Sequence, residues 1–134
     1  MIQTVAHNIN GWDRRVAQAL RQRDPEPLQR LARACVAAGA QVLEINPGPL
    51  HHTPETMEFA VTTIQQVAEI PLCLSADNAT ALEAGLRACR QPAMVNYVDA
   101  EGERLGLLPL AARHQAQVIL LTAQRGVITI GAEE

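Results

Sequence analysis

The chain has 134 residues, enough for one domain with a buried core, and its single Trp, Tyr and Phe mean that aliphatic side chains must fill this core. A formal net charge of −3 argues against nucleic acid or an acidic membrane as a partner, because either would need a basic patch. No window contains the roughly 18 unbroken apolar residues of a membrane-spanning helix, and no charged-then-apolar leader begins the chain, so we expect a cytoplasmic protein.

Five short apolar segments alternate with amphipathic helical patterns along the chain. They cover residues 4–6, 42–45, 72–74, 93–95 and 118–121. Strands that are buried on both faces read as apolar runs, and their alternation with helices is typical of a parallel sheet. We therefore expect an α/β fold made of parallel β/α units.

The segments between the strands carry signals for helix starts and ends. Asp24 and Pro25 supply an N-cap and a first-turn proline for a helix that Gly39 ends, and Thr53 and Pro54 repeat this start. A third helix is expected to begin near residues 77–78.

Two other helices are expected, one before residue 24 and one over residues 102–114. The earlier one should turn three apolar side chains inward: Val16, Ala17 and Leu20. In the later one, Gly106 and Pro109 interrupt the helical pattern. After the fifth strand, residues 127–130 form a short β-prone tail that is expected to cover one sheet edge.

Cysteine and histidine spacing gives no support for a metal site. Cys35, Cys73 and Cys89 are widely separated, without a Cys-x-x-Cys pair, and free thiols commonly pack in the cores of cytoplasmic proteins. Neighbouring His51 and His52 should point apart, so we expect them in a solvated loop and not as a ligand pair.

Polar side chains follow the strands at their carboxyl ends, where parallel β/α sheets bind their ligands. The candidate site residues are Asn10, Asn46, Ser75 and Asn96. For Asn10 and Asn46 a structural role is an equal alternative, because asparagine beside a Gly or Pro turn often satisfies loop backbone groups. Asn96 is the residue for which a pocket position is favoured.

Six short blocks occur in a recognisable order and spacing. They are residues 9–11 (Ile-Asn-Gly), 23–27 (Arg-Asp-Pro-Glu-Pro), 46–49 (Asn-Pro-Gly-Pro), 83–86 (Glu-Ala-Gly-Leu), 93–96 (Ala-Met-Val-Asn) and 108–111 (Leu-Pro-Leu-Ala). Together they resemble the methyltetrahydrofolate:corrinoid/iron–sulfur protein methyltransferases, a pterin-binding family related to dihydropteroate synthase. The resemblance implies a single domain over residues 1–134 that corresponds to the first half of a TIM barrel, with five strands and about four crossover helices.

The resemblance also implies a function. Members of the family move a methyl group from methyltetrahydrofolate to the cobalt of a corrinoid protein, so the folate is a substrate and cobalamin belongs to a partner, with no cofactor bound by this chain itself. The matched positions imply that Asn96 contacts the pterin and that Asn10 and Asn46 lie at the pocket rim.

Several departures from the family pattern affect this interpretation. Ser75 stands where the family has a pterin-binding aspartate, Glu44 where it usually has a shorter aspartate, and His7 where it usually has glutamate. The family's second pterin-binding aspartate and its catalytic asparagine lie on later strands and have no counterpart in this chain. We therefore expect weak folate binding that Ser75→Asp improves, no ionisable side chain placed beside Asn96 to relay a proton, and no catalysis by this chain alone.

Three hypotheses remain open from the sequence. The chain is an amino-terminal piece of an intact methyltransferase, a short non-catalytic half-barrel that serves as a binding or assembly subunit, or an unrelated β/α protein with a different ligand. Five strands cannot close at the usual tilt and shear of a barrel, so the outer strands should keep unpaired edges. We therefore expect a homo-oligomer or a complex with a complementing chain.

Overall fold

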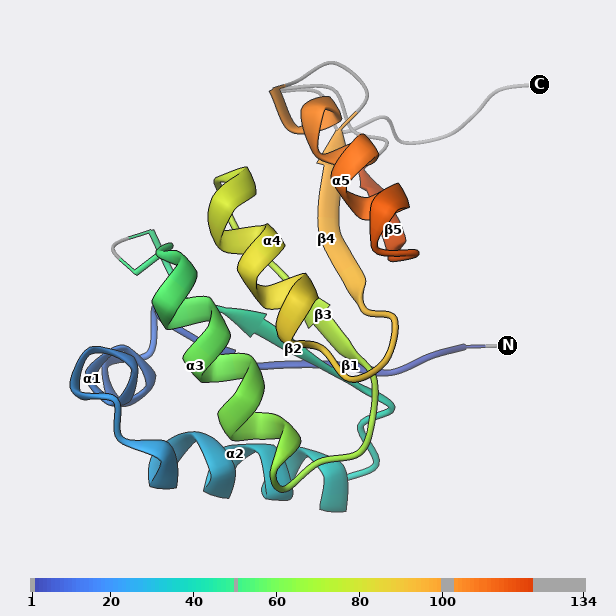
Figure 1. The fold of residues 1–134 in the computed structure, drawn as a ribbon. Helices are drawn as coiled ribbons and strands as arrows, with labels where there is room; N and C mark the ends of the chain where they lie inside the picture. Colours follow the sequence, from blue (N-terminus) through green and yellow to red (C-terminus); the bar gives the residue numbers. More distant parts are fainter. Residues whose placement is uncertain (1, 50, 100–102, 122–134) are drawn as a thin grey trace, which may run out of the picture.

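The computed structural model describes residues 2–49, 51–99 and 103–121 (Figure 1). The elements follow in the order β1 (Val5–Asn10), α1 (Arg14–Gln22), α2 (Pro25–Ala37), β2 (Val42–Asn46), α3 (Pro54–Gln65), β3 (Leu72–Leu74), α4 (Ala79–Ala88), β4 (Met94–Asp99), the 3-10 helix η1 (Glu103–Leu107), α5 (Leu108–Arg113) and β5 (Gln117–Leu121). All neighbouring strands pair in parallel, in the spatial order β1-β2-β3-β4-β5. This confirms the predicted α/β fold, which is consistent with a partial TIM-barrel-like unit.

The helices begin where the sequence signals place them. The Asp24 side chain accepts a hydrogen bond from the Glu26 N–H at the start of α2, and Thr53 accepts one from the Thr56 N–H at the start of α3. Past the end of α2, Gly39 has a φ of +94°, a left-handed conformation that glycine adopts without a steric penalty.

One cluster of buried aliphatic side chains lies between the sheet and the helices, which gather on one side of it (Figure 1). β2 and β3 alternate in the usual way, so that Leu43, Ile45, Leu72 and Leu74 join this cluster. The residues between them, such as Glu44, therefore point to the opposite face of the sheet. This opposite face carries the polar groups described below.

Two sequence-based expectations are wrong in detail. In α1 the buried set is Val16, Ala19 and Leu20, because residues at i, i+3 and i+4 share a helix face, whereas Ala17 is only half-buried. β4 runs past Asn96 to Asp99. The expected interruption of the last helical stretch is confirmed, because η1 ends at Leu107 and α5 follows, with Pro109 in its first turn, where its missing N–H has no partner to lose.

The structure also differs from expectation at the edge strand β1. β1 continues to Asn10, and its pairing with β2 shifts register between Ala6 and Ile9. The predicted tail over residues 127–130 lies outside the described residues.

Among the helices that are described, none combines the length and the apolar character needed to cross a bilayer.

The loops after β1 and β2 pack directly on each other at Gly11. Its N–H donates a 2.8 Å hydrogen bond to the Asn46 carbonyl, and a Cβ built there would overlap the backbone of Pro47. We expect Gly11→Ala to lower the free energy of unfolding by about 2–3 kcal/mol, because the overlapping group is backbone and cannot rotate away. Urea unfolding measures this. Gly106→Ala is the matched control, since a Cβ at Gly106 meets no atom within 4 Å and should change stability little.

Candidate functional site

The sheet brings the four predicted site residues into one row across its strands. Asn10 and Asn46 are direct pairing partners. Asn46, Ser75 and Asn96 each come directly after residues that are paired with one another in β2, β3 and β4. The Ser75 N–H extends this ladder with a 2.9 Å hydrogen bond to the Ile45 carbonyl. The row therefore lies at the carboxyl ends of β1, β2 and β3 and within β4, which continues to Asp99.

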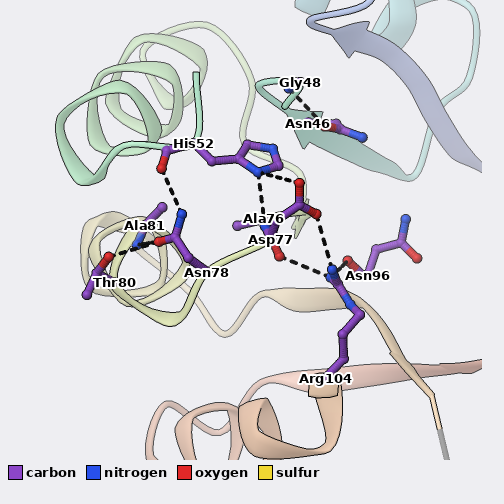
Figure 2. Close-up of polar contacts among 10 residues, drawn as sticks. All are labelled: Asn46, Gly48, His52, Ala76, Asp77, Asn78, Thr80, Ala81, Asn96 and Arg104. Atoms are coloured by element: carbon purple, nitrogen blue, oxygen red, sulfur yellow. Dashed lines mark hydrogen bonds and ion pairs between the residues drawn. The ribbon is translucent and has the colours of Figure 1, made fainter. Parts of the chain in front are cut away.

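The two rim asparagines use their side-chain oxygens locally. Asn46 Oδ1 accepts a 3.0 Å hydrogen bond from the Gly48 N–H, a contact that shapes the turn after β2 (Figure 2). Asn10 Oδ1 accepts a 3.0 Å hydrogen bond from the Trp12 N–H. Both oxygens therefore have the structural role of satisfying loop backbone groups. The Asn10 amide nitrogen is not used in this contact and makes a second one, described next.

A hydrogen-bond network links Asn96 to β1 through a buried carboxylate. Asn96 Nδ2 donates to Glu44 Oε1 at 2.8 Å, and His7 Nδ1 lies 2.6 Å from Glu44 Oε2. Asn10 Nδ2 lies 2.8 Å from His7 Nε2. Glu44 is only 5% exposed, whereas the His7 side chain is 61% exposed. The network therefore connects a buried acidic group to solvent through an imidazole.

The backbone explains how these side chains meet. Glu44 points away from the helices because its neighbours on β2 face the core. The register shift in β1 leaves His7 opposite Glu44 without a direct pairing partner of its own. On the other side, β3 separates β2 from β4, so the contact between Glu44 and Asn96 passes over β3, where Cys73 is the pairing partner of Glu44.

The contacts also fix the roles of donor and acceptor. The Asn10 oxygen already accepts from a backbone N–H, so its NH₂ group donates to His7 Nε2. His7 then carries its proton on Nδ1 and donates it to Glu44, which accepts from both sides as a carboxylate. The expectation that Asn96 has no ionisable neighbour is therefore wrong: Glu44 contacts it directly and His7 lies one contact further on.

A second polar cluster, His52, Asp77 and Arg104, lies in the loops after β2, β3 and β4 (Figure 2). His52 Nδ1 lies 2.9 Å from Asp77 Oδ2, and Arg104 Nη1 donates to Asp77 Oδ1 at 3.3 Å. The His52 side chain is only 8% exposed, so the expected solvated position is wrong for this residue.

The buried thiols are poor candidates for chemistry. Burial, with a smaller contribution from the nearby Glu44 charge, raises the pKa of Cys73 to about 12, and burial raises the pKa of Cys89 to about 11. Thiols of this kind stay protonated near neutral pH and are weak nucleophiles. No group of three potential metal ligands from His, Cys, Asp and Glu occurs in residues 2–49, 51–99 and 103–121.

An apolar cavity lies away from the row. It has a volume of about 400 Å³ and lies at the exposed edge of β1, where residues 4–8 face residues 31–40 of α2 and the turn that follows.

Comparison with known proteins links the chain to one kind of enzyme. No family model matches it. A methylcorrinoid:tetrahydrofolate methyltransferase of Eubacterium limosum is 28% identical over 108 residues, which cover 79% of this chain and 40% of that protein. The chain thus spans less than half the length of this relative. The similarity supports a relationship to a methyltransferase family of this kind.

Proposed function

We propose that the chain forms the pterin-binding part of a methyltransferase that moves a methyl group between a tetrahydrofolate-type pterin and a corrinoid on a partner protein. The observation that carries this proposal is the contact of Asn96 with the buried Glu44 carboxylate on the face of the sheet opposite the helices. The similarity to a methylcorrinoid:tetrahydrofolate methyltransferase supports the choice of substrates.

Glu44 supplies the carboxylate for pterin recognition that Ser75 lacks. A pterin ring presents neighbouring N–H groups, which a carboxylate binds through charge-assisted hydrogen bonds. Glu44 has one methylene more than aspartate, and its carboxylate reaches across β3 to Asn96. The Asn96 amide can both donate and accept, so it suits the mixed edge of the ring.

His7 and Glu44 also supply proton chemistry. A methyl group leaves a tertiary pterin amine only when the nitrogen gains a proton or a strong hydrogen bond, and in the reverse direction the amine must lose a proton. His7 can pass its Nδ1 proton to Glu44 once the Asn10 amide releases Nε2 and this nitrogen takes a proton from solvent, which leaves the imidazole neutral. Proton transfer by a positioned group typically contributes about 10²–10⁴-fold to a rate.

We propose that this chain alone does not complete the reaction. The resemblance assigns a second pterin-binding aspartate and a catalytic asparagine to later strands. A non-catalytic binding or assembly subunit is the second candidate function, and the observation that favours it is the neutral Ser75 within the row.

Exposed strand edges suggest how the chain assembles. Within the described residues β1 and β5 are the outer strands, and Leu120 and Leu121 on β5 are 58% and 40% exposed. We propose that a second copy or a complementing chain covers these edges.

Titration of tetrahydrofolate against the chain tests the proposal. We expect weak but saturable binding that Asn96→Ala reduces about tenfold, as for the loss of one or two hydrogen bonds. Asn8→Ala is the matched control, because Asn8 is an exposed asparagine on β1 outside the network. Tight binding that Asn96→Ala leaves unchanged would contradict the assignment of the site.

A further inference from the structure

We propose that Arg104 is a positioning residue that holds β4 to the loop after β3 and thereby aims Asn96 at Glu44. The inference rests on the proposed function, because it concerns the same site. Arg104 lies on η1, beyond the end of β4, and does not itself join the network.

The Arg104 guanidinium binds the backbone of β4 and of the loop after β3. Nε donates to the Tyr97 carbonyl at 2.7 Å, and Nη2 donates to the carbonyls of Asn96 and Ala76 at 3.2 and 3.1 Å (Figure 2). With the bond to Asp77, four acceptors surround this one group. The Arg104 side chain is only 18% exposed, so these contacts are largely shielded from water.

The Arg104 contacts fall where β4 is least regular. The pairing of β4 with β5 shifts register between Asn96 and Val98, and two of the carbonyls that Arg104 binds belong to this stretch. The guanidinium also stacks on the Tyr97 ring, 4.7 Å from its centroid. Figure 2 shows the Asn96 side chain directed away from Arg104. Arg104 therefore holds the backbone of Asn96 and leaves its amide to face Glu44.

Asp77 connects Arg104 to a third loop. It contacts Arg104 through Oδ1 and His52 through Oδ2, so the loops after β2, β3 and β4 are joined in succession. Asn78 adds a second link, since its Nδ2 donates to the His52 carbonyl at 2.8 Å. The loops after β2, β3 and β4 are thus held together by side-chain contacts that are separate from the contacts among Asn96, Glu44, His7 and Asn10.

Arg104→Lys is the variant that tests the role of Arg104. Lysine keeps the charge but lacks the planar fork that spans several carbonyls. We expect the side-chain NH₂ signals of Asn96 in a nuclear magnetic resonance spectrum to shift or broaden, and the dissociation constant of tetrahydrofolate to rise about tenfold. Arg113→Lys is the matched control, because Arg113 is 67% exposed and makes only a long contact with Glu83, 3.8 Å from its carboxylate.

The two measurements test the positioning role of Arg104 separately from the proposed function. The Asn96 signals can be measured without a ligand. Unchanged signals in Arg104→Lys would therefore contradict the positioning role of Arg104 even if the wild type bound no folate. A changed melting temperature with unchanged Asn96 signals and unchanged affinity would also overturn it, because that is the result of a purely structural role. Absent binding by the wild type would count against the proposed function alone.

Discussion

Glu44→Gln is expected to weaken tetrahydrofolate binding roughly 10- to 100-fold, the range for losing a hydrogen bond that involves a charged group. Glutamine has nearly the same shape, and Asn96 can still donate to its amide oxygen, so the fold should be kept. The loss then reports the missing carboxylate charge and its capacity to accept pterin N–H groups. Isothermal titration of both forms measures the change.

A second acidic residue controls for the change in net charge. Glu69 is exposed in the turn before β3, away from the row, so Glu69→Gln removes the same charge without touching the network. We expect it to bind like the wild type. Equal affinities for the wild type and Glu44→Gln would show that the buried carboxylate does not contact the pterin.

Ser75→Asp is expected to affect tetrahydrofolate affinity differently in the wild type and in Glu44→Gln. From the sequence alone, restoring the aspartate of the family should improve binding. In the structure the Glu44 carboxylate already reaches across β3 to Asn96, and Ser75 is the neighbour of Asn96 in the row. A second carboxylate there would repel it, because like charges at close range disfavour each other. We therefore expect little gain from Ser75→Asp alone and a recovery of affinity when it is combined with Glu44→Gln.

Self-association is the second large effect that we expect. The outer strands β1 and β5 expose apolar side chains, with Val5 at 39% and Leu120 at 58%. Burying a few hundred Å² of such surface favours association by several kcal/mol, at about 25 cal/mol per Å². Light scattering after size-exclusion chromatography should therefore show a dimer or larger species at micromolar concentration.

A lysine on the edge strand should reverse this association. We expect Leu120→Lys to shift the population toward monomer, because charged residues on an edge strand discourage pairing with another chain. Leu108→Lys is the matched control, since Leu108 is also exposed, at 41%, but lies on α5. A stable wild-type monomer without dye-binding apolar surface would show that the edges are closed in another way.

The sequence predicts the fold well because its signals are local. Apolar runs identify all five strands, and N-cap residues such as Asp24, Thr53 and Asn78 identify helix starts without any knowledge of tertiary structure. The row of site residues could also be predicted, since the carboxyl ends of parallel strands meet at one edge.

The network around Glu44 depends on features that no local pattern reveals. Alternation along β2 places Glu44 opposite the core, and this signal was present in the sequence. The register shift that brings His7 to Glu44 is a property of the paired strands. Arg104 and His52 were missed because their partners lie 7 to 28 residues away in the sequence, and only the folded chain brings these groups together.

The most direct test of the proposed site is to locate tetrahydrofolate on the chain by nuclear magnetic resonance. We expect the signals of His7, Ser75 and Asn96 to move together as ligand is added and to give a single dissociation constant, because His7 and Asn96 contact the Glu44 carboxylate and Ser75 is the neighbour of Asn96 in the row. Shifts confined to the apolar cavity between β1 and α2, with these three residues unaffected, would contradict the pterin site that we propose.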